Sequence, residues 1–289
     1  MDLTSEKIKI AVITGPTATG KTALAVKLAE EFSGEIISVD SRQVYKGMDI
    51  GSGKDLAEYG SIPYHLIDIA DPATETFNLF DFCKAAYAAI ADIASRGRMP
   101  ILCGGTALYL NALLQSYNLP GGKLPERRSG IPRIRQQGIE PAFVPPFELD
   151  ALVMGVYFPR KTVRSRIEAR LDARLANGMI DEIARLNKAG VSFEKLEFFG
   201  LEYREISLYL QNKATFDEMR TNLLNKIRQF AKRQDIFFRK MEREGIPIYW
   251  LNEAKEPDPR KLLSAFISGK PLPEIGFRLC DHLNGPSFT

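Results

Sequence analysis

The chain has 289 residues, of which 45% are hydrophobic and 26% charged, and its formal net charge is +3. This is the composition of an ordinary soluble globular protein, and the length allows one large or two modest domains. The net charge is too small to indicate a nucleic-acid partner by itself, so only local clusters of charge can argue for one.

Several classes of protein are excluded by the same inspection. No apolar run approaches the roughly 20 residues that a membrane-spanning helix needs. The N-terminal stretch MDLTSEKIKI has no apolar core of the kind that signal peptides carry. Cys83, Cys103 and Cys280 lack the spacing of metal ligands or redox motifs. We therefore expect reduced thiols in a cytoplasmic protein.

The most informative stretch is IKIAVITGPTATGKT, residues 8–22. It begins as a run of β-formers, turns tightly, and opens an apolar-periodic helix at Gly20. Residues 15–22 match the phosphate-binding pattern G-x-x-x-x-G-K-[ST], and strand, loop and helix occur in the order that the pattern requires. This order disfavours a chance match in a glycine-containing turn. The residues predicted to bind phosphate are Gly15, Pro16, Thr17, Ala18, Thr19, Gly20, Lys21 and Thr22.

The chemistry of this loop points to a diphosphate or triphosphate ligand. Glycines let backbone N–H groups converge on phosphate oxygens, and the start of the following helix adds a favourable dipole. Lys21 supplies a point charge for the phosphates. The Thr22 hydroxyl can ligate Mg²⁺, which is the expected cofactor.

A second candidate is Asp40, at the end of the predicted strand EIISVD over residues 35–40. In open α/β sheets, ligands bind outside the carboxyl ends of the strands. Asp40 would then face the phosphate site. Position alone leaves open that it is only a turn or cap residue, a common use of aspartate.

Strands and helices alternate through residue 115, which predicts an α/β fold with a P-loop NTPase-like parallel sheet flanked by helices. The predicted strands are 8–13, 35–40, 64–69 and 99–103, and the predicted helices are 22–32, 77–95 and 107–115. A loop rich in Pro, Gly and Arg, residues 117–150, interrupts the alternation. A strand at 152–158 follows it.

The C-terminal part is predicted to hold long helices. One helical region runs from Arg160 to Gly190 and another spans 215–244, before a last strand at 246–251 and a helix in the tail. Each long helix carries a basic stripe: Arg166, Arg170 and Arg174 on the first, and Lys226, Arg233 and Lys240 on the second. Such stripes are often solvated surface, but beside a phosphate site they favour contact with an anion or a nucleic acid.

Together these residues resemble one family, the tRNA dimethylallyltransferases or isopentenyl transferases. The matching segments follow the family's order and span most of the chain. They are GPTATGKT, SVDSRQVYKGMDIG, HLIDI, GGTALYL, the arginine series from Arg160, QFAKRQ and FFRK. The pairing of DSRQ with AKRQ is far more specific than the phosphate loop alone.

The resemblance implies transfer of a dimethylallyl group from its diphosphate to the exocyclic amine of an adenine beside a tRNA anticodon. The resemblance implies that Asp40 is the general base for the amine. It implies that Lys21 and Thr22 are catalytic residues at the leaving diphosphate. It also implies that the P-loop and Arg160 bind that diphosphate. The residues implied to contact tRNA are Asp40, Ser41, Arg42, Gln43, Thr106, Lys232, Arg233 and Gln234.

The chain also departs from the family pattern. Members usually carry a helical insertion that grips the anticodon stem, and residues 117–150 replace it with a shorter segment. We therefore expect a transferase core made of residues 1–116 and 151–289, with 117–150 as a loop-rich remnant. This makes the acceptor, more than the chemistry, the open question.

Three alternatives remain at this point. The acceptor could be a free adenine nucleotide, the protein could be a P-loop small-molecule kinase, or it could bind RNA or nucleotides without catalysis. A kinase would not need DSRQ or AKRQ. Intact Lys21, Thr22 and Asp40 argue against a non-catalytic relative. The expected partners are a tRNA anticodon loop and dimethylallyl diphosphate, with no membrane contact, and the expected state is a monomer.

Overall fold

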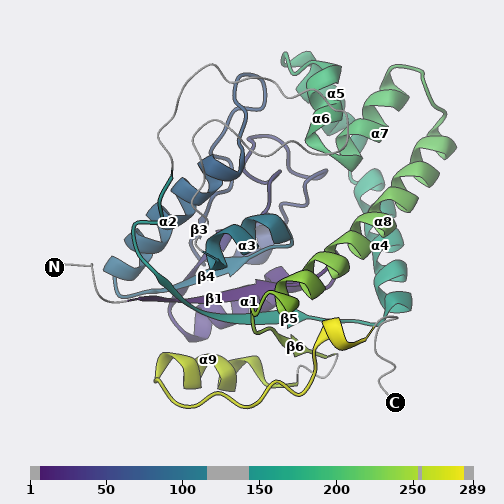
Figure 1. Ribbon diagram of the computed structural model, residues 1–289. Helices are drawn as coiled ribbons and strands as arrows, with labels where there is room; N and C mark the ends of the chain where they lie inside the picture. The colour runs from purple at the N-terminus through teal and green to yellow at the C-terminus, as the bar shows by residue number, and fades with distance from the viewer. Residues whose placement is uncertain (1–6, 116–142, 253–255, 283–289) are drawn as a thin grey trace.

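A six-stranded parallel sheet with strand order β3-β2-β4-β1-β5-β6 forms the centre of the protein (Figure 1). The computed structural model describes residues 7–115, 143–252 and 256–282. Every strand pairing is parallel. The strands are β1 (Ile8–Thr14), β2 (Gly34–Ser38), β3 (Tyr64–His65), β4 (Met99–Cys103), β5 (Leu149–Val156) and β6 (Tyr249–Leu251).

Helices cover both faces of the sheet because its central strands are apolar on both sides. Along β1, Ile10 and Val12 face one core and Ala11 and Ile13 face the other. The first core packs against α2 (Leu79–Ser95), α3 (Ala107–Leu114) and the C-terminal half of α8 (Phe216–Arg243). The second packs against α1 (Lys21–Glu31), the short helix η1 (Leu56–Tyr59) and α9 (Pro259–Ile267). Another short helix, η2 (Leu279–Asp281), adds Leu279 to the first core.

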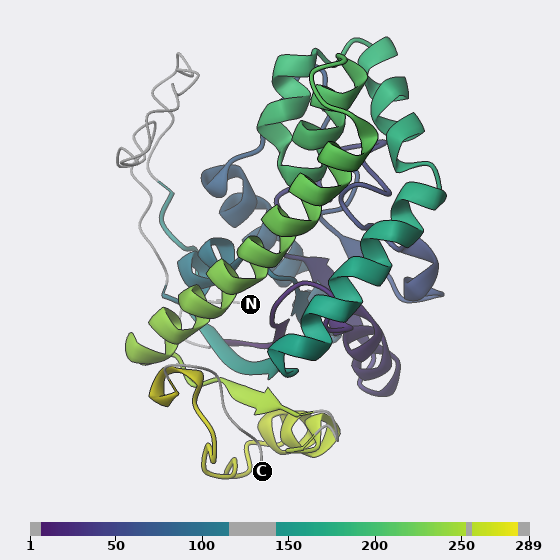
Figure 2. The same ribbon diagram turned by 90° about the vertical axis from the view of Figure 1, so that its right-hand side faces the viewer.

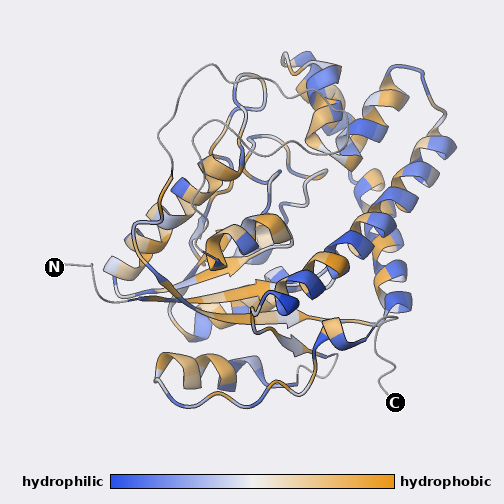
Figure 3. Cartoon of the chain, in the orientation of Figure 1, coloured by the Kyte–Doolittle hydropathy of each residue, from blue (hydrophilic) through white to orange (hydrophobic). Residues whose placement is uncertain are grey.

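A third core lies among the helices that stand beyond one end of the sheet. It joins α4 (Arg160–Ala176), α5 (Met179–Lys188), α6 (Phe193–Phe199), α7 (Leu201–Leu210) and the first half of α8. Val44, Tyr45 and Met48, from the loop after β2, are buried in the same core. Figure 2 shows α4 and α8 running side by side away from the sheet. Figure 3 shows apolar strands at the centre and many hydrophilic residues along these two helices.

The predicted fold class is confirmed, and most predicted elements are present with small shifts. The predicted helix after Arg160 breaks at Gly178, whose φ of 90° is left-handed, so that α4 and α5 are separate. The predicted strand 64–69 is only Tyr64–His65, because Leu66 and Asp68 also adopt positive φ, at 62° and 55°. The last strand begins at Tyr249 rather than at the predicted residue 246, so it is shorter than predicted.

Two differences concern the middle of the chain. Helices α6 and α7 were not predicted, although Phe199, Tyr203 and Ile206 are buried in the third core. Strand β5 begins at Leu149 rather than at 152, and Leu149 pairs with Ile8 of β1. Most of the predicted remnant insertion 117–150 lies outside the described part of the chain, because residues 116–142 are not described. Among the described residues, no helix is both long and apolar enough to cross a bilayer.

Candidate active site

Most of the predicted site residues come from the loops that leave the carboxyl ends of three neighbouring strands, β2, β4 and β1, and the others lie on α4 and α8. The P-loop follows β1, the turn with Asp40 follows β2, and Gly104 to Thr106 follow β4 between them. In a parallel sheet these ends lie on one edge, so loops far apart in sequence converge there.

The P-loop has the backbone geometry that its glycines predict. Gly20 has a φ of 78° and precedes the first residue of α1, Lys21. Gly15 has a φ of 139°, and a Cβ there would lie 2.5 Å from the Val156 carbonyl oxygen. In the described structure, no protein group accepts a hydrogen bond from the backbone N–H groups of residues 18–22. These donors are therefore available to an anion.

Lys21 lies in a poorly solvated place behind the loop. Its Nζ donates to the Pro16 carbonyl oxygen at 2.6 Å. Burial, together with the positive charge of Arg170, lowers the pKa of Lys21 to about 8. Cys103, at the end of β4, is buried behind it, and burial raises the pKa of that thiol to about 11. A phosphate group near Lys21 would favour the charged ammonium.

Asp40 shapes a turn and is also half-buried next to the site. Its Oδ1 accepts hydrogen bonds from the backbone N–H of Arg42 at 2.8 Å and of Gln43 at 3.4 Å. Asp40 is thus a turn residue, as one of the two sequence interpretations expected. This does not exclude the catalytic interpretation, because no described donor lies on Oδ2.

The loop after β4 brings Asp40 and the P-loop together. A Cβ on Gly104 would lie 2.2 Å from the Val39 carbonyl oxygen, so only glycine fits there. The Thr106 Oγ1 accepts from the backbone N–H of Ser41 at 3.4 Å. The Thr14 hydroxyl donates to the Gly104 carbonyl at 3.0 Å. Loops from three strands are therefore fastened to each other, which fixes Asp40 relative to the P-loop.

Gln234 is a buried bridge inside the site. Its Oε1 accepts from the backbone N–H of Thr17 at 3.0 Å, and its Nε2 donates to the Gly105 carbonyl at 2.8 Å. The side chain of this predicted tRNA-contacting residue is thus already used to join two loops to α8. Its neighbours Lys232 and Arg233 are exposed.

Gln43 is also engaged within the protein. Its Oε1 accepts from the Ser38 hydroxyl at 2.7 Å, and its Nε2 donates to the Gly53 carbonyl at 3.1 Å. Arg42, in the same turn, donates to the Ser41 hydroxyl at 3.0 Å and remains half-buried beside Gly200. Unlike Gln43, Ser41 and Arg42 form described side-chain hydrogen bonds only within the turn.

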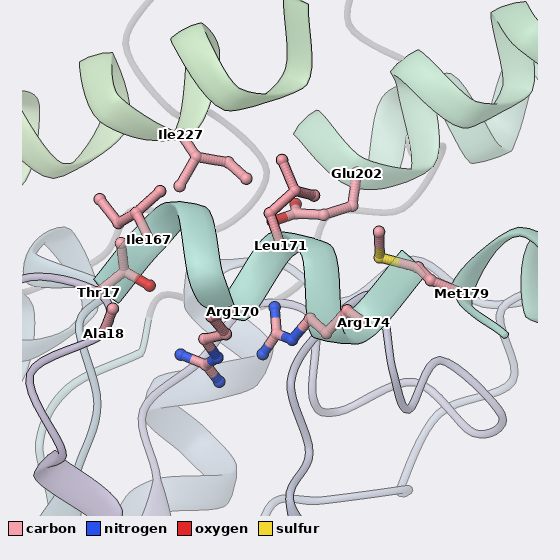
Figure 4. A pocket seen from close by; sticks show the side chains of 9 residues that line it. All are labelled: Thr17, Ala18, Ile167, Arg170, Leu171, Arg174, Met179, Glu202 and Ile227. Carbon is pink, nitrogen blue, oxygen red and sulfur yellow. The ribbon is translucent and has the colours of Figure 1, made fainter. Parts of the chain in front are cut away.

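A pocket opens beside the P-loop, between it and the helical layer (Figure 4). One wall is apolar and the other is charged. The lining residues are Thr17 and Ala18 of the P-loop, Ile167, Arg170, Leu171 and Arg174 of α4, Met179, Glu202 and Ile227. Burial raises the pKa of Glu202. The lining thus combines apolar side chains with two arginines and one carboxyl group.

A second glycine turn, residues 47–54, lies against the site and was not assigned a role from sequence. The buried Glu182 of α5 accepts from the backbone N–H groups of Asp49, Ile50 and Gly51 at 3.0, 2.6 and 3.0 Å. The Tyr203 hydroxyl donates to the same carboxylate at 3.1 Å. The signal that could have found Glu182 is an acidic residue on the apolar face of a helix.

The chain is similar to known proteins over most of its length. The model of the family described as IPP transferase matches residues 43–144 and 129–241, and that of isopentenyl transferase matches residues 8–59. The tRNA dimethylallyltransferase 1 of Geotalea uraniireducens is 45% identical, with 85% of this chain and 93% of that protein covered. The tRNA dimethylallyltransferase of Treponema pallidum strain Nichols is 42% identical over 83% and 90%.

The chain belongs to the IPP transferase family. Among solved structures, the full-length tRNA isopentenylpyrophosphate transferase of Bacillus halodurans superposes with a TM-score of 0.74 at 29% identity. The match covers 91% of this chain and 96% of that one. A eukaryotic dimethylallyltransferase described as acting on tRNA has a TM-score of 0.75 at 24% identity, which shows the fold alone.

Within this IPP transferase, the basic stripes are arranged differently from a simple RNA-facing surface. On α8, Lys226 is paired with Glu205, and Lys240 lies 3.4 Å from Glu244. Arg233 remains exposed between them. On α4, the Arg166 guanidinium stacks 3.9 Å from the Phe158 ring centroid. Arg170 and Arg174 of α4 turn into the pocket beside the P-loop rather than outward.

Arg160, the arginine predicted to bind diphosphate, begins α4 just after β5 and is exposed. The end of β5 touches the P-loop, because Val156 packs against Gly15. Arg160 and Arg239 both act on Asp235, a carboxyl that sequence reasoning overlooked. Burial raises the pKa of Asp235 to about 6, although the two arginines oppose that rise.

Proposed function

We propose that this IPP transferase moves a dimethylallyl group from dimethylallyl diphosphate to the exocyclic amine of an adenine next to the anticodon in tRNA. The observation that carries the proposal is the placement of Asp40 at the end of β2, fastened through Thr106 to the loops around the P-loop. A base and a site for an anionic leaving group then share one edge of the sheet. The relatives named tRNA dimethylallyltransferase support the substrate pair.

The reaction needs one new bond and one broken bond. The adenine nitrogen attacks the first carbon of the donor, a C–N bond forms, and the C–O bond to diphosphate breaks. The diphosphate leaves with the electron pair, and the proton of the amine passes to Asp40. An exocyclic amine is a poor nucleophile, so a positioned carboxylate assists it. The N–H groups of residues 18–22 and Lys21 stabilise the charge that develops on the leaving group.

The pocket in Figure 4 accounts for the donor on this proposal. Ile167, Leu171 and Ile227 offer an apolar wall for a five-carbon chain, next to the P-loop residues Thr17 and Ala18. Arg160, exposed at the start of α4, adds a further positive charge at the phosphate end. Binding of the apolar part holds the reactive carbon in place.

The residues present also fit a bound Mg²⁺. This ion usually binds one or two protein oxygens together with substrate phosphates and water, so it needs no closed cage. The Thr22 hydroxyl, one residue after Lys21 and half-buried, is the ligand that we propose. Mg²⁺ supplies charge neutralisation on the diphosphate when it is bound. Among the described residues, no group of three or more His, Cys, Asp or Glu side chains could hold a metal ion.

Contact with RNA is proposed for surfaces that surround this edge. Ser41 and Arg42 lie in the turn after β2, and Lys232 and Arg233 are exposed on α8 beside the buried Gln234. We reassign Gln43 and Gln234 as positioning residues, because their side chains already join elements of the site. The target adenine must leave its stack to reach Asp40.

The shortened insertion makes a local grip on RNA part of the proposal. The IPP transferase model matches in two pieces that overlap at residues 129–144, inside the stretch 117–150 where the family insertion is expected to be reduced. Affinity for nucleic acid follows the number of phosphates neutralised. We therefore propose that an isolated anticodon stem-loop is prenylated within about tenfold of whole tRNA, a difference of about 1.4 kcal/mol.

The proposal is tested by incubating the purified protein with dimethylallyl diphosphate, Mg²⁺ and either bulk tRNA, an anticodon stem-loop or AMP. Nucleoside mass spectrometry then shows which acceptor gains the five-carbon group. Faster prenylation of AMP than of either RNA would move the protein to the free-nucleotide class. Phosphoryl transfer from ATP without any prenylation would make it a kinase. We also propose that the protein is a cytoplasmic monomer, and gel filtration tests its oligomeric state.

A further inference from the structure

Two arginines of α4 share the pocket beside the P-loop, and the function proposed above uses neither. Arg170 and Arg174 are four residues apart, so they lie on one face of the helix. Figure 4 shows both guanidinium groups on the same side of α4, away from Ile227. A Cβ on Gly53 would lie 1.8 Å from Nη2 of Arg174 and 2.6 Å from Nη2 of Arg170. The two cationic groups are therefore close neighbours.

Two carboxyl groups, Asp55 and Glu202, lie near this pair, but among the described residues only Asp55 forms an ion pair with it. Arg170 lies 3.2 Å from the half-exposed carboxylate of Asp55. Arg174 makes no hydrogen bond or ion pair with any residue that the structure describes. Burial lowers the pKa of Arg174, the charge of Arg170 lowers it further, and Glu202 offsets only part of this. Two neighbouring cations in a poorly solvated place are costly unless an anion joins them.

The neighbouring P-loop indicates which kind of anion the two arginines would bind. Thr17 and Ala18 line the same pocket as the two arginines. The charge of Arg170 also reaches Lys21 and lowers the pKa of that residue. An anion held by the P-loop would thus be within the field of both arginines. Gly53 keeps the approach open, because any side chain there would overlap the guanidinium of Arg174.

We propose that Arg174, together with Arg170, binds the diphosphate of the donor from the α4 side. This inference rests on the proposed function, because it takes the donor to be a diphosphate. The guanidinium fork matches phosphate oxygens, and charge-assisted hydrogen bonds are stronger than neutral ones. As the C–O bond breaks, negative charge grows on the diphosphate, and the pair stabilises it together with Lys21.

The test measures binding of inorganic diphosphate with Mg²⁺ by calorimetry, and prenylation of tRNA in parallel. Arg174→Met keeps a stem of similar length and removes the charge, and Arg174→Lys keeps the charge without the fork. Arg185→Met is the matched control, because Arg185 is exposed on α5. We expect Arg174→Met to weaken diphosphate binding 10- to 100-fold, Arg174→Lys to weaken it less, and Arg185→Met to bind like wild type.

Unchanged diphosphate affinity in folded Arg174→Met protein overturns the inference, as does a loss confined to tRNA affinity, which would make Arg174 an RNA contact. If Arg174→Met does not fold, Gly53→Ala decides the matter, because its methyl group displaces the Arg174 guanidinium without removing the charge. Wild-type affinity in Gly53→Ala then overturns the inference, and weaker binding supports it. A wild-type protein that fails to prenylate any adenine rejects the proposed function itself, and the two failures remain distinguishable.

Discussion

The two turns at the site, residues 15–22 and 47–54, each place a glycine with positive φ directly before a lysine, but their N–H groups are used in opposite ways. Gly20 precedes Lys21 with a φ of 78°, and Gly53 precedes Lys54 with a φ of 72°. In the P-loop, no described protein group accepts from the N–H groups of residues 18–22. In the turn at 47–54, the Glu182 carboxylate accepts from three consecutive N–H groups.

The two lysines differ in the same way. Lys54 has a fully buried side chain that contacts the carboxylates of Asp49 and Asp68. Among the described residues, Lys21 donates a hydrogen bond only to a carbonyl oxygen of its own loop, and its pKa is lowered. A turn of this composition is therefore a ligand site only where the protein leaves its donors free. In the second turn, the protein supplies its own anion.

The largest expected effect comes from Asp40, which lies between the two turns. Asp40→Asn keeps an oxygen for the N–H groups of Arg42 and Gln43 but removes the base. We expect the chemical step to slow by about 10²- to 10⁴-fold while both substrates still bind. Single-turnover kinetics measures this step directly. Rates near wild type would reduce Asp40 to a turn residue.

The next largest effect is expected when the lysine of each turn is replaced in a separate variant. Lys21→Ala should lower kcat/KM by about 10²- to 10³-fold, or about 2.7–4 kcal/mol, since a charge at the leaving group is lost. Lys54→Met should instead lower stability, because the carboxylates of Asp49 and Asp68 lose their cation. Steady-state kinetics and urea unfolding of both variants separate the two outcomes. Equal effects of the two variants on kcat/KM would contradict the distinction between the turns.

Removing the internal anion is expected to have a moderate effect. Glu182→Gln replaces one acceptor oxygen by an amide that cannot accept from the turn. We expect the free energy of unfolding to fall by about 1–3 kcal/mol. Activity should fall only a few-fold, because the turn reaches the site through the Gly53 carbonyl and Gln43. Asp181→Asn, an exposed neighbour, is the control. Urea midpoints that coincide for both variants would show that the turn is stable without the Glu182 carboxylate.

The last expected effect, small near pH 8, is a pH dependence that only the P-loop should show. Burial, with the charge of Arg170, lowers the pKa of Lys21 to about 8, so the free protein loses this positive charge above pH 8. Diphosphate binding must then restore one proton, and the dissociation constant should rise by up to about tenfold per pH unit above pH 8. Calorimetry between pH 7 and 9.5 measures this slope. Lys21→Ala, which has no such proton to restore, is the reference, and an identical slope there would exclude Lys21 as its source.

The sequence was sufficient for the parts of the molecule that obey local rules. The glycine pattern predicted the P-loop, and strand–helix alternation predicted the parallel sheet. What it missed depends on tertiary contacts. Periodicity placed Arg170 and Arg174 on one face of a helix. That this face lies toward the site follows only from the packing of the two guanidinium groups against Gly53. The motif marked Gln234, yet its bridging of Thr17 and Gly105 joins residues more than 100 positions apart.

The length of α8 has a consequence for how this protein can vary. The helix has 28 residues, so it extends about 42 Å at 1.5 Å per residue. A capping box of Thr215 and Glu218 fixes one end, and Gln234 is locked to the loops of the sheet. Inserting one residue between Leu224 and Gln234 would rotate one half against the other by about 100°. An insertion or deletion in this part of α8 therefore changes both the distance and the rotation between its two ends. Only a change close to a whole number of helical turns keeps the same residues facing the sheet loops.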